Sequence, residues 1–286
     1  MSETDRSATD SPHATDSYDP RLAHPSHELI HDRADALLSL HHAPEILTLV
    51  NVWDVASALV IAELPETKAL ATASHAIAAA FGYEDGERIP PELMIDAVGR
   101  IALATSLPVT ADLESGYGDP GEIVRRAIGV GVVGANIEDR MRPHIESVEN
   151  VAEVVKAAEQ EGVRFVLNAR TDALLTGDAA GPGWDEAVQD AIERGRAYLD
   201  AGAACVFVPG AVDEATALRL VEGIGHLRVS VMGIPGGPSA ARYEQLGIAR
   251  ISYGPWPQRV ALAALQESAL SLYAGAGLPD DTPTTS

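Results

Sequence analysis

The sequence predicts a single large domain with a closed (β/α)₈ barrel fold. Short apolar or β-branched runs alternate with amphipathic stretches along most of the 286 residues, and eight such runs can be counted. Glycines stand at predicted helix ends just before four of the runs, at Gly131, Gly162, Gly202 and Gly247. Eight strands that alternate with helices favour parallel pairing and barrel closure. A doubly wound open sheet is the alternative, which the lack of a G-x-G-x-x-G motif after the first run disfavours.

Each predicted strand is a short run rich in Val, Ile, Leu or Ala, as expected where both faces of a strand are buried. The eight predicted strands are Ile46–Val52, Ala69–Ala73, Pro108–Asp112, Val132–Glu138, Phe165–Arg170, Cys205–Pro209, Arg228–Met232 and Ile248–Tyr253. The stretches between them show the spacing of amphipathic helices. They include Pro91–Thr105, Ser147–Glu161, Trp184–Ala201, Glu214–Gly223 and Pro257–Tyr273.

The barrel is expected to occupy residues 33–273, between two tails. Residues 1–32 are rich in Ser, Thr, Asp, His and Pro and are predicted to form a disordered acidic tail. Such a segment has too few apolar side chains to offset the entropy lost on ordering. Its histidines lack the spacing of a metal site and are interpreted as solvated. Residues 274–286 are predicted to form a second, flexible tail.

The composition excludes several classes of protein. The chain has 42 acidic and 20 basic residues, and its formal net charge is -22. So negative a surface repels phosphate backbones and anionic lipid, so we expect no nucleic-acid or membrane partner. A single cysteine excludes an intramolecular disulfide, and no apolar run approaches the ~20 residues of a membrane span. With no secretory signal visible, a cytoplasmic location is expected.

Three neighbouring predicted strands end in polar residues, at the end where (β/α)₈ barrels carry their active sites. Side chains two apart on a strand point the same way, so these residues are expected to converge. They are Thr110, Asp112 and Glu114 on one strand, Asn136 and Glu138 on the next, and Asn168 and Arg170 on the third. A purely structural barrel would carry Val or Ile there.

Three converging carboxylates, those of Asp112, Glu114 and Glu138, are costly unless a cation neutralises them. Oxygen ligands without a His or Cys cluster suit Mg²⁺, or Mn²⁺, better than Zn²⁺. Arg170 is then predicted to be a fixed cation for a substrate carboxylate or a developing oxyanion. The alternative is a set of structural ion pairs around the rim. Structural ion pairs are the favoured interpretation for any one of these residues taken alone. For Asp112, Glu114, Glu138 and Arg170 taken together, a functional site is favoured.

Three motifs in order resemble the isocitrate lyase/phosphoenolpyruvate mutase superfamily. They are D-x-E-x-G-Y-G at Asp112–Gly118, I-E-D at Ile137–Asp139 and N-A-R-T-D at Asn168–Asp172. Shorter supporting motifs occur at Asn51–Asp54, Ala73–His75, Gly82–Gly86 and Arg194–Gly202. The resemblance extends from about Leu37 to Tyr273 and implies a (β/α)₈ barrel. It also implies a homotetramer in which the last helix packs on a neighbouring subunit.

The resemblance further implies that a C–C or P–C bond is made or broken beside a 2-oxo or 2-hydroxy carboxylate, through an enolate bound to Mg²⁺. It assigns roles by position. The metal-shell acids are Asp112, Glu114 and Glu138, several acting through water, and Asp85 is a catalytic acid beside the metal and the reacting centre. Arg170 stabilises the enolate oxygen. Substrate contacts are expected from Ser74, His75, Asn168 and Arg170.

The chain departs from the family in one loop. Family lyases carry a K-K-C-G-H-type gating loop after the I-E-D motif, and phosphonate-processing members carry Lys and Asn there. This chain has the short segment Arg140–Glu146 without Cys. His144 is a candidate replacement proton donor because its ordinary pKa suits acid–base work, but a surface histidine on a mobile loop is equally compatible with the sequence. Cys205 is predicted to lie in the core at the far end of the barrel.

The sequence disfavours two other enzyme mechanisms and a non-catalytic barrel, and Asp85, Asp112, Glu138 and Arg170 together make the non-catalytic barrel the least favoured. A Schiff-base aldolase needs a lysine at a strand end, whereas Lys68 precedes a predicted strand and Lys156 lies in a helix. The segment Gly233–Ser239 could bind phosphate, but such a Gly/Pro cluster is more often a turn. We therefore expect a Mg²⁺-dependent lyase of a small 2-oxo or 2-hydroxy carboxylate, either oxaloacetate-like or 2-methylisocitrate-like. Hydrolysis or decarboxylation is an open alternative.

Overall fold

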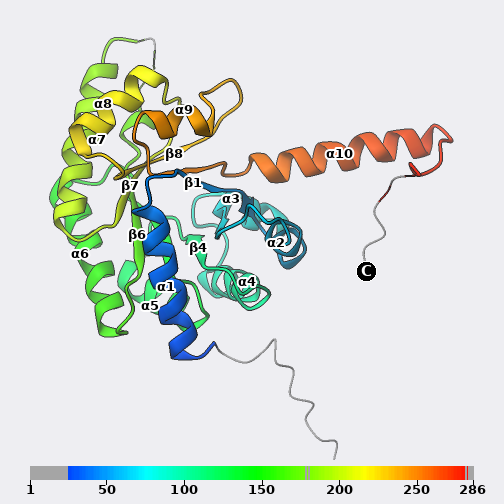
Figure 1. Cartoon of the computed structure of the whole chain (residues 1–286), viewed down its shortest axis with the longest axis horizontal. Coiled ribbons are helices and arrows are strands. Elements are labelled where there is room, and N and C mark those ends of the chain that lie inside the picture. Colours follow the sequence, from blue (N-terminus) through cyan, green and yellow to red (C-terminus); the bar gives the residue numbers. More distant parts are fainter. Residues whose placement is uncertain (1–24, 178, 180, 281, 283–286) are drawn as a thin grey trace, which may run out of the picture.

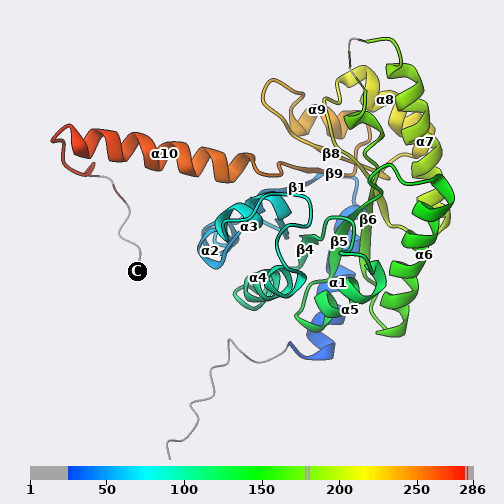
Figure 2. The same cartoon turned by 180° about the vertical axis from the view of Figure 1, so that it is seen from behind.

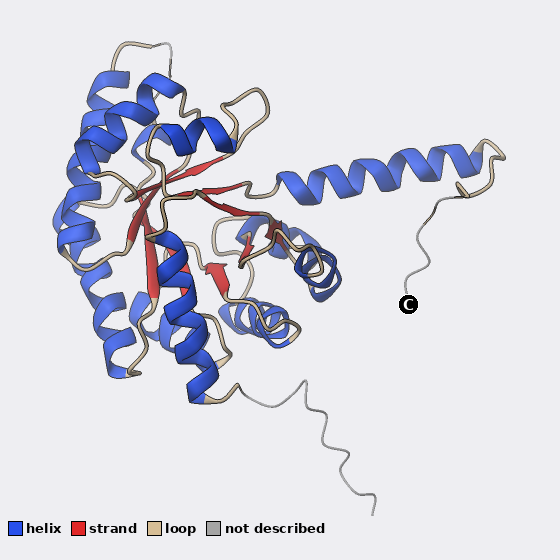
Figure 3. Cartoon of the chain, viewed as in Figure 1, coloured by secondary structure: helices blue, strands red, loops and turns tan. Residues whose placement is uncertain are grey.

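A computed structural model describes residues 25–177, 179, 181–280 and 282. Its strands form one fully parallel sheet in the order β1-β9-β8-β7-β6-β5-β4-β3-β2. The strands lie at the centre of the molecule and the helices lie around them (Figure 3). The strands are β1 (Leu47–Leu49), β2 (Asn51–Val52), β3 (Leu70–Thr72), β4 (Val109–Asp112), β5 (Gly134–Glu138), β6 (Val166–Arg170), β7 (Cys205–Val208), β8 (Val229–Met232) and β9 (Arg250–Ser252).

The first predicted strand closes the barrel. Ile46–Val52 is divided into β1 and β2, with Val50 between them. β1 pairs with β9, where Leu47 lies opposite Arg250, and β2 pairs with β3, where Asn51 lies opposite Ala71. One stretch of chain therefore joins both ends of the sheet. The predicted (β/α)₈ barrel is confirmed, and the open doubly wound sheet is excluded.

Helices connect the strands and cover the outside of the sheet (Figures 1 and 2). Several begin at a residue whose side chain accepts a hydrogen bond from the first helical turn, namely Ser26, Asp54, Asp119, Asp213 and Ser239. The helices are α1 (His27–His41), α2 (Val55–Ala62), α3 (Ser74–Ala80), α4 (Pro91–Leu103), α5 (Pro120–Gly129), α6 (His144–Gln160), α7 (Trp184–Asp200), α8 (Glu214–Ile224), α9 (Ala240–Gln245) and α10 (Trp256–Tyr273), with a 3₁₀ turn η2 at Ala173–Leu175.

The folded domain begins earlier than the predicted residue 33, because α1 begins at His27. Residues 27–32, expected in the tail, are helical because Ser26 caps the helix and Ile30, Ala34 and Leu37 are buried along one side. The Arg33 guanidinium donates to the carbonyl of Ala102, near the end of α4. Helix α1 therefore covers the amino-terminal end of the barrel. Residues 1–24 of the predicted tail lie outside the described residues.

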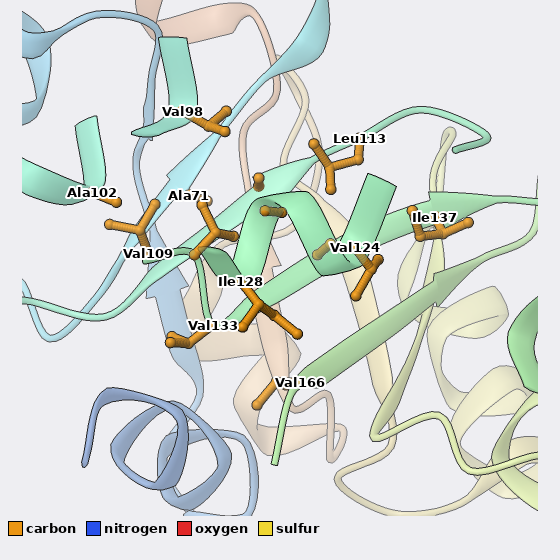
Figure 4. Close-up of a cluster of buried hydrophobic side chains, with 14 of the residues drawn as sticks. Ala71, Val98, Ala102, Val109, Leu113, Val124, Ile128, Val133, Ile137 and Val166 are labelled. Atoms are coloured by element: carbon orange, nitrogen blue, oxygen red, sulfur yellow. The ribbon is translucent and has the colours of Figure 1, made fainter. Parts of the chain in front are cut away.

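Small aliphatic side chains fill the space between sheet and helices (Figure 4). Ala71 and Val109 face Val98 of α4, while Val133 lies beside Ile128 of α5, and all five are almost fully buried. Burial of each valine or isoleucine contributes about 1.5–3 kcal/mol. This packing fixes the strands, and with them the positions of the side chains at their ends.

Helix α10 extends away from the barrel (Figure 1). Its apolar side chains are largely exposed, including Val260, Leu262, Leu265 and Leu270. No helix among the described residues is long and apolar enough to cross a membrane. Residues 274–280 and 282, which belong to the predicted C-terminal tail, follow α10 without a further helix or strand.

Candidate active site

A pocket of about 170 Å³ lies at the carboxyl-terminal ends of the strands. Six of the residues predicted for the site line this pocket, namely Ser74, His75, Asp85, Asp112, Asn136 and Arg170. They lie on or follow strands β3 to β6. The opposite wall is uncharged and comes from the ends of β7, β8 and β9, with Phe207, Pro209, Met232, Ser252, Gly254 and Pro255.

Asp112 ends β4 at the floor of the pocket. Its Oδ2 accepts hydrogen bonds from the Ser74 hydroxyl at 2.7 Å and the Ser74 amide at 3.2 Å. Its Oδ1 is buried and has no hydrogen-bond partner among the residues that the structure describes. Leaving a buried carboxylate oxygen without a donor is costly, so this atom is suited to meet a ligand.

Arg170 ends β6 directly opposite Glu138, which ends β5. Its Nη1 lies 2.9 Å from the Glu138 carboxylate, and its Nε donates to Asp172 at 2.6 Å. Burial would lower the pKa of Arg170, but the carboxylates of Glu138, Asp172 and Asp112 together raise it. Burial in turn raises the pKa of Glu138, against the opposing effect of Arg170. Arg170 is thus a permanently charged group held in one orientation at the pocket.

Glu114 reaches the site by a different route from the one predicted. Strand β4 ends at Asp112, and Glu114 has a φ of 53°, so its direction is set by a turn and not by strand alternation. The turn buries its carboxylate, which accepts from the Glu87 amide and, at 3.4 Å, from the Tyr117 hydroxyl. Burial, followed by the charges of Asp112 and Asp85, raises the pKa of Glu114 to about 7. The cluster of acids therefore forms, although its geometry differs.

Glu87 belongs to the same cluster and was not singled out from the sequence. Its Oε1 accepts from the Ser115 amide at 3.1 Å, the Ser115 hydroxyl at 2.7 Å and the Tyr117 amide at 2.8 Å. These bonds fasten the segment that follows α3 to the turn containing Glu114. The run Glu84–Glu87 is acidic and follows the family-like motif at Asp85, but spacing could not show which carboxylate turns inward.

Asp85 and His75 face each other at the pocket. The Asp85 carboxylate lies 3.4 Å from His75 Nδ1, and the two side chains are 50% and 42% exposed. This makes an ion pair only when the histidine is protonated. Both side chains are half-exposed and line the pocket, so both are open to solvent and to a small molecule in the pocket.

Asn168, one of the predicted substrate contacts, is buried below the pocket. Its side chain is fully buried and donates to Asn136 Oδ1 at 2.9 Å and to Ser230 Oγ at 3.3 Å. It points inward like Arg170 but lies two residues earlier on β6, about 7 Å deeper in the barrel. It supports the pocket floor from below and is not among the described residues that line the pocket.

His144 is placed differently from the prediction of a mobile loop. It is the first residue of α6, directly after Pro143, and its side chain is exposed. It does not belong to the described lining of the pocket. Cys205 is buried at the start of β7, where burial raises the pKa of its thiol to about 12, so its predicted place in the core is confirmed.

The site fits a divalent cation held mainly through water. Within the described ranges, no three His, Cys, Asp or Glu side chains are close enough together to ligate one ion directly. Mg²⁺ is usually bound by one or two carboxylates and keeps several waters. Asp112 Oδ1 offers one direct ligand, and the charges of Asp112, Asp85 and Glu138 are near enough to raise the pKa of Glu114. This donor set matches the preference of Mg²⁺ or Mn²⁺ for oxygen.

Comparisons with known proteins agree with this arrangement. A family model described as phosphoenolpyruvate phosphomutase matches residues 37–273. An uncharacterised protein of Mycobacterium tuberculosis is 32% identical over 251 residues, which cover 85% of this chain and 91% of that protein. A protein of Burkholderia cenocepacia assigned as a phosphonomutase has a solved structure with 36% identity and a TM-score of 0.78, and the match covers 86% of this chain and all (100%) of that one.

A second solved structure is that of oxaloacetate acetylhydrolase in complex with its product, oxalate. It is 25% identical to this chain with a TM-score of 0.77, and the match covers 87% of this chain and 91% of that one. The two solved structures share the barrel and most of its length with this chain, while the activities in their names differ. The likeness therefore identifies a common scaffold and leaves the reaction to be argued from the site.

Proposed function

Because this chain belongs to the phosphoenolpyruvate mutase/isocitrate lyase superfamily, whose members are enzymes, we propose that it is a Mg²⁺-dependent carbon–carbon lyase. Its substrate is a small 2-oxo or 2-hydroxy carboxylate, and oxaloacetate-like acids are favoured over 2-methylisocitrate-like ones. The observation that carries the proposal is Asp112 Oδ1, which has no hydrogen-bond partner in the described part of the chain, on a residue that lines one pocket with Arg170. A hard cation and a fixed guanidinium are the groups that stabilise an enolate oxygen.

Each side chain has a distinct part in this proposal. Asp112 would hold the ion directly, with Asp85, Glu114 and Glu138 holding its waters. Mg²⁺ bound there would supply Lewis-acid stabilisation of the substrate's 2-oxo or enolate oxygen. Arg170, fixed by Glu138 and Asp172, would donate to the same oxygen as negative charge develops on it. Ser74 orients Asp112 through its hydroxyl and amide.

The pocket supports a small substrate. Within the described lining, Arg170 is the one arginine or lysine, and the wall from β7 to β9 carries no charged side chain. A tricarboxylate would place a second or third carboxylate against that wall without a cation to meet it, which is costly. An oxaloacetate-like acid avoids this. A P–C reaction is disfavoured because the segment Arg140–Glu146 lacks the Lys and Asn of phosphonate-processing members.

Water is the favoured proton donor to the carbon fragment that leaves. The segment Arg140–Glu146 has no cysteine, and His144 lies outside the described pocket lining. His75 does line the pocket and contacts Asp85, so it is better placed than His144 to pass a proton between the pocket and solvent. A hydrolytic or decarboxylating reaction is therefore included in the proposal. The likeness to oxaloacetate acetylhydrolase supports it.

The proposal is tested by product analysis with a panel of acids in the presence of Mg²⁺: oxaloacetate, isocitrate, 2-methylisocitrate and phosphonopyruvate. We expect turnover of oxaloacetate-like acids, its loss with a chelator, and at least a hundredfold loss in kcat/KM for Asp112→Asn, about 3 kcal/mol of transition-state stabilisation. Asp96→Asn, which removes a carboxylate from an exposed ion pair with Arg100 on α4, is the matched control. Turnover that survives complete metal removal would refute the proposal.

We also propose that α10 packs on a neighbouring subunit and that the enzyme is a homotetramer in the cytoplasm. The support for packing is the row of exposed leucines on α10, which the barrel of the same chain leaves uncovered. Exposed apolar surface of this kind is typical of subunit contacts. The tetramer and the location rest on the family resemblance and on the composition.

A further inference from the structure

Arg140 occupies the middle of the acidic cluster. It directly follows the I-E-D motif, and each nitrogen of its guanidinium faces a different carboxylate. Nε lies 3.1 Å from Glu138, Nη1 lies 3.3 Å from Glu87, and Nη2 lies 3.7 Å from Glu114. These three carboxylates come from segments far apart in the sequence. A single cation of the chain itself therefore bridges the end of β5 and the two loops that carry Glu87 and Glu114, around the proposed metal site.

The backbone is bent to place Arg140 there. Arg140 and the following Met141 have φ values of 48° and 54°, in the left-handed region that residues other than glycine seldom adopt. Asp139 holds this turn, because its carboxylate accepts from the Met141 amide at 2.9 Å and its carbonyl accepts from the Arg142 amide at 2.9 Å. Strained turns persist where the surroundings over-determine them, often at functional sites.

Asp139 is in turn fixed from below. Its Oδ2 accepts from the Tyr198 hydroxyl at 2.7 Å and from Arg194 at 3.2 Å, and its Oδ1 also accepts from the Asp172 amide at 3.1 Å. The same buried carboxylate thus positions the turn of Arg140 and the segment that holds Arg170. The place of Arg140 is a built feature of the fold and not the chance position of a surface side chain.

Two of the three carboxylates that Arg140 contacts, Glu114 and Glu138, are those that would bind the waters of the divalent ion. A guanidinium and a hydrated cation are both hydrogen-bond donors with positive charge, and they seek the same oxygens. Two cations at one cluster repel each other, so each weakens the hold of the other.

We propose that Arg140 is an internal counter-ion of the metal site, which stabilises the acidic cluster in the metal-free protein and weakens its affinity for the divalent ion. This inference rests on the proposed function, because it assumes that the cation binds beside Asp112. The direction of the change in metal affinity distinguishes this role from a purely structural one. Removing the charge of Arg140 should strengthen metal binding, whereas loss of a structural contact would leave it unchanged or weaken it.

The test is Mn²⁺ binding to the full chain, measured by the electron paramagnetic resonance signal of free Mn²⁺, with Mg²⁺ calorimetry as a second readout. We expect Arg140→Gln to lower the Mn²⁺ dissociation constant about three- to tenfold, since a charge near a partly buried site acts through an intermediate dielectric. The metal-free variant should melt at a lower temperature and gain more from added Mg²⁺. Arg140→Lys keeps the charge and should lie closer to the wild type.

Arg142→Gln is the matched control. It removes the same charge two residues further along the same segment. Arg142 pairs with Glu146 at 3.3 Å and donates to the Ser115 hydroxyl at 3.2 Å, and among the described residues it forms no ion pair with Glu87, Glu114 or Glu138. We expect its Mn²⁺ affinity to stay within twofold of the wild type. Equal tightening in both variants would overturn the proposal in favour of a general effect of net charge, as would an unchanged or weaker affinity in Arg140→Gln.

The result also separates this inference from the proposed function. If the wild type binds Mn²⁺ and Arg140→Gln binds it no more tightly, only the role of Arg140 fails. If Mn²⁺ binds to Arg140→Gln alone, the counter-ion role is supported in its strongest form. If neither binds, both the metal site and the role of Arg140 are refuted.

Discussion

The two halves of the barrel rim are built from different kinds of side chain. Strands β4, β5 and β6 end in Asp112, Glu138 and Arg170, and His75 and Asp85 follow β3. The region around the ends of β7 to β9 instead contributes Phe207, Pro209, Met232 and a serine. Both halves line the same pocket. On the charged half, each group is held by others, as Arg170 is by Glu138 and Asp172. On the uncharged half, the side chains provide shape.

The difference suggests a division of labour between reaction and selection. Charged groups fixed in a partly buried site stabilise charge that develops in a transition state. Uncharged walls discriminate between substrates by size and by the cost of burying a carboxylate without a partner. The charged half should therefore control the rate with every substrate, and the uncharged half should control which substrate is preferred.

The largest effect should come from the charged half, with Arg170→Lys. Lysine keeps the charge but loses the planar group that contacts Glu138 and Asp172 and points to the pocket. We expect kcat/KM to fall by about 10²–10³ with every accepted substrate, the usual cost of losing an oxyanion donor. Steady-state kinetics on the acid panel measures this.

The control is Arg125→Lys. Arg125 forms an exposed ion pair with Glu122 on α5, so this substitution should leave the rate unchanged. A value of kcat/KM for Arg170→Lys within about threefold of the wild type, which is under ~1 kcal/mol, would show that the rate does not depend on the geometry of the charged half.

A smaller effect, a change in substrate preference, is expected from a substitution on the uncharged half. Met232→Lys places a cation at the end of β8, on the wall that carries no charge among the described lining residues. The ratio of kcat/KM for 2-methylisocitrate to that for oxaloacetate should rise about tenfold, because the additional carboxylate gains a partner. Met232→Leu, which keeps volume and polarity, should leave the ratio within twofold. A uniform loss with both acids would contradict the division.

The two halves also differ in how well the sequence predicts them. The ends of β4, β5 and β6 stand out because Asp112, Glu138 and Arg170 occupy positions where a structural strand would carry Val or Ile. Alternation on a strand then gives their common direction. Phe207 and Met232 look like core residues in the sequence, so nothing marks them as a pocket wall. Polar exceptions in an apolar pattern are informative, and apolar residues in such a pattern are not.

Features that depend on turns could not be predicted even in the charged half. Glu114 lies beyond the last strand residue, and its carboxylate meets the amide of Glu87, 27 positions away in the chain. The left-handed turn at Arg140 has no glycine to announce it. Strand order and the capped helices follow from local patterns, whereas these contacts depend on how two separate loops meet.

The last expected effect is on stability instead of catalysis, and it concerns the pH dependence of stability in the metal-free protein. Burial and the nearby charges of Asp112 and Asp85 raise the pKa of Glu114 from 4.5 to about 7. The folded state thus binds this proton more tightly than the unfolded state does. The resulting stability is fully present below pH 4.5 and is lost as the pH rises through 7. A shift of this size corresponds to at most about 3 kcal/mol.

The measurement is the free energy of unfolding by urea between pH 5 and 8, with chelator, for wild type and Glu114→Gln. The stability of the wild type relative to the variant should fall across this range, because glutamine cannot ionise. Added Mg²⁺ should flatten the wild-type curve, since a cation favours the charged carboxylate. The control is Glu122→Gln, which replaces an exposed partner of Arg125, and its stability should depend on pH as that of the wild type does.

If wild type and Glu114→Gln instead keep a constant difference in stability from pH 5 to 8, Glu114 ionises no later in the folded chain than in the unfolded one. The charged half would then be neutralised by its arginines without a divalent ion.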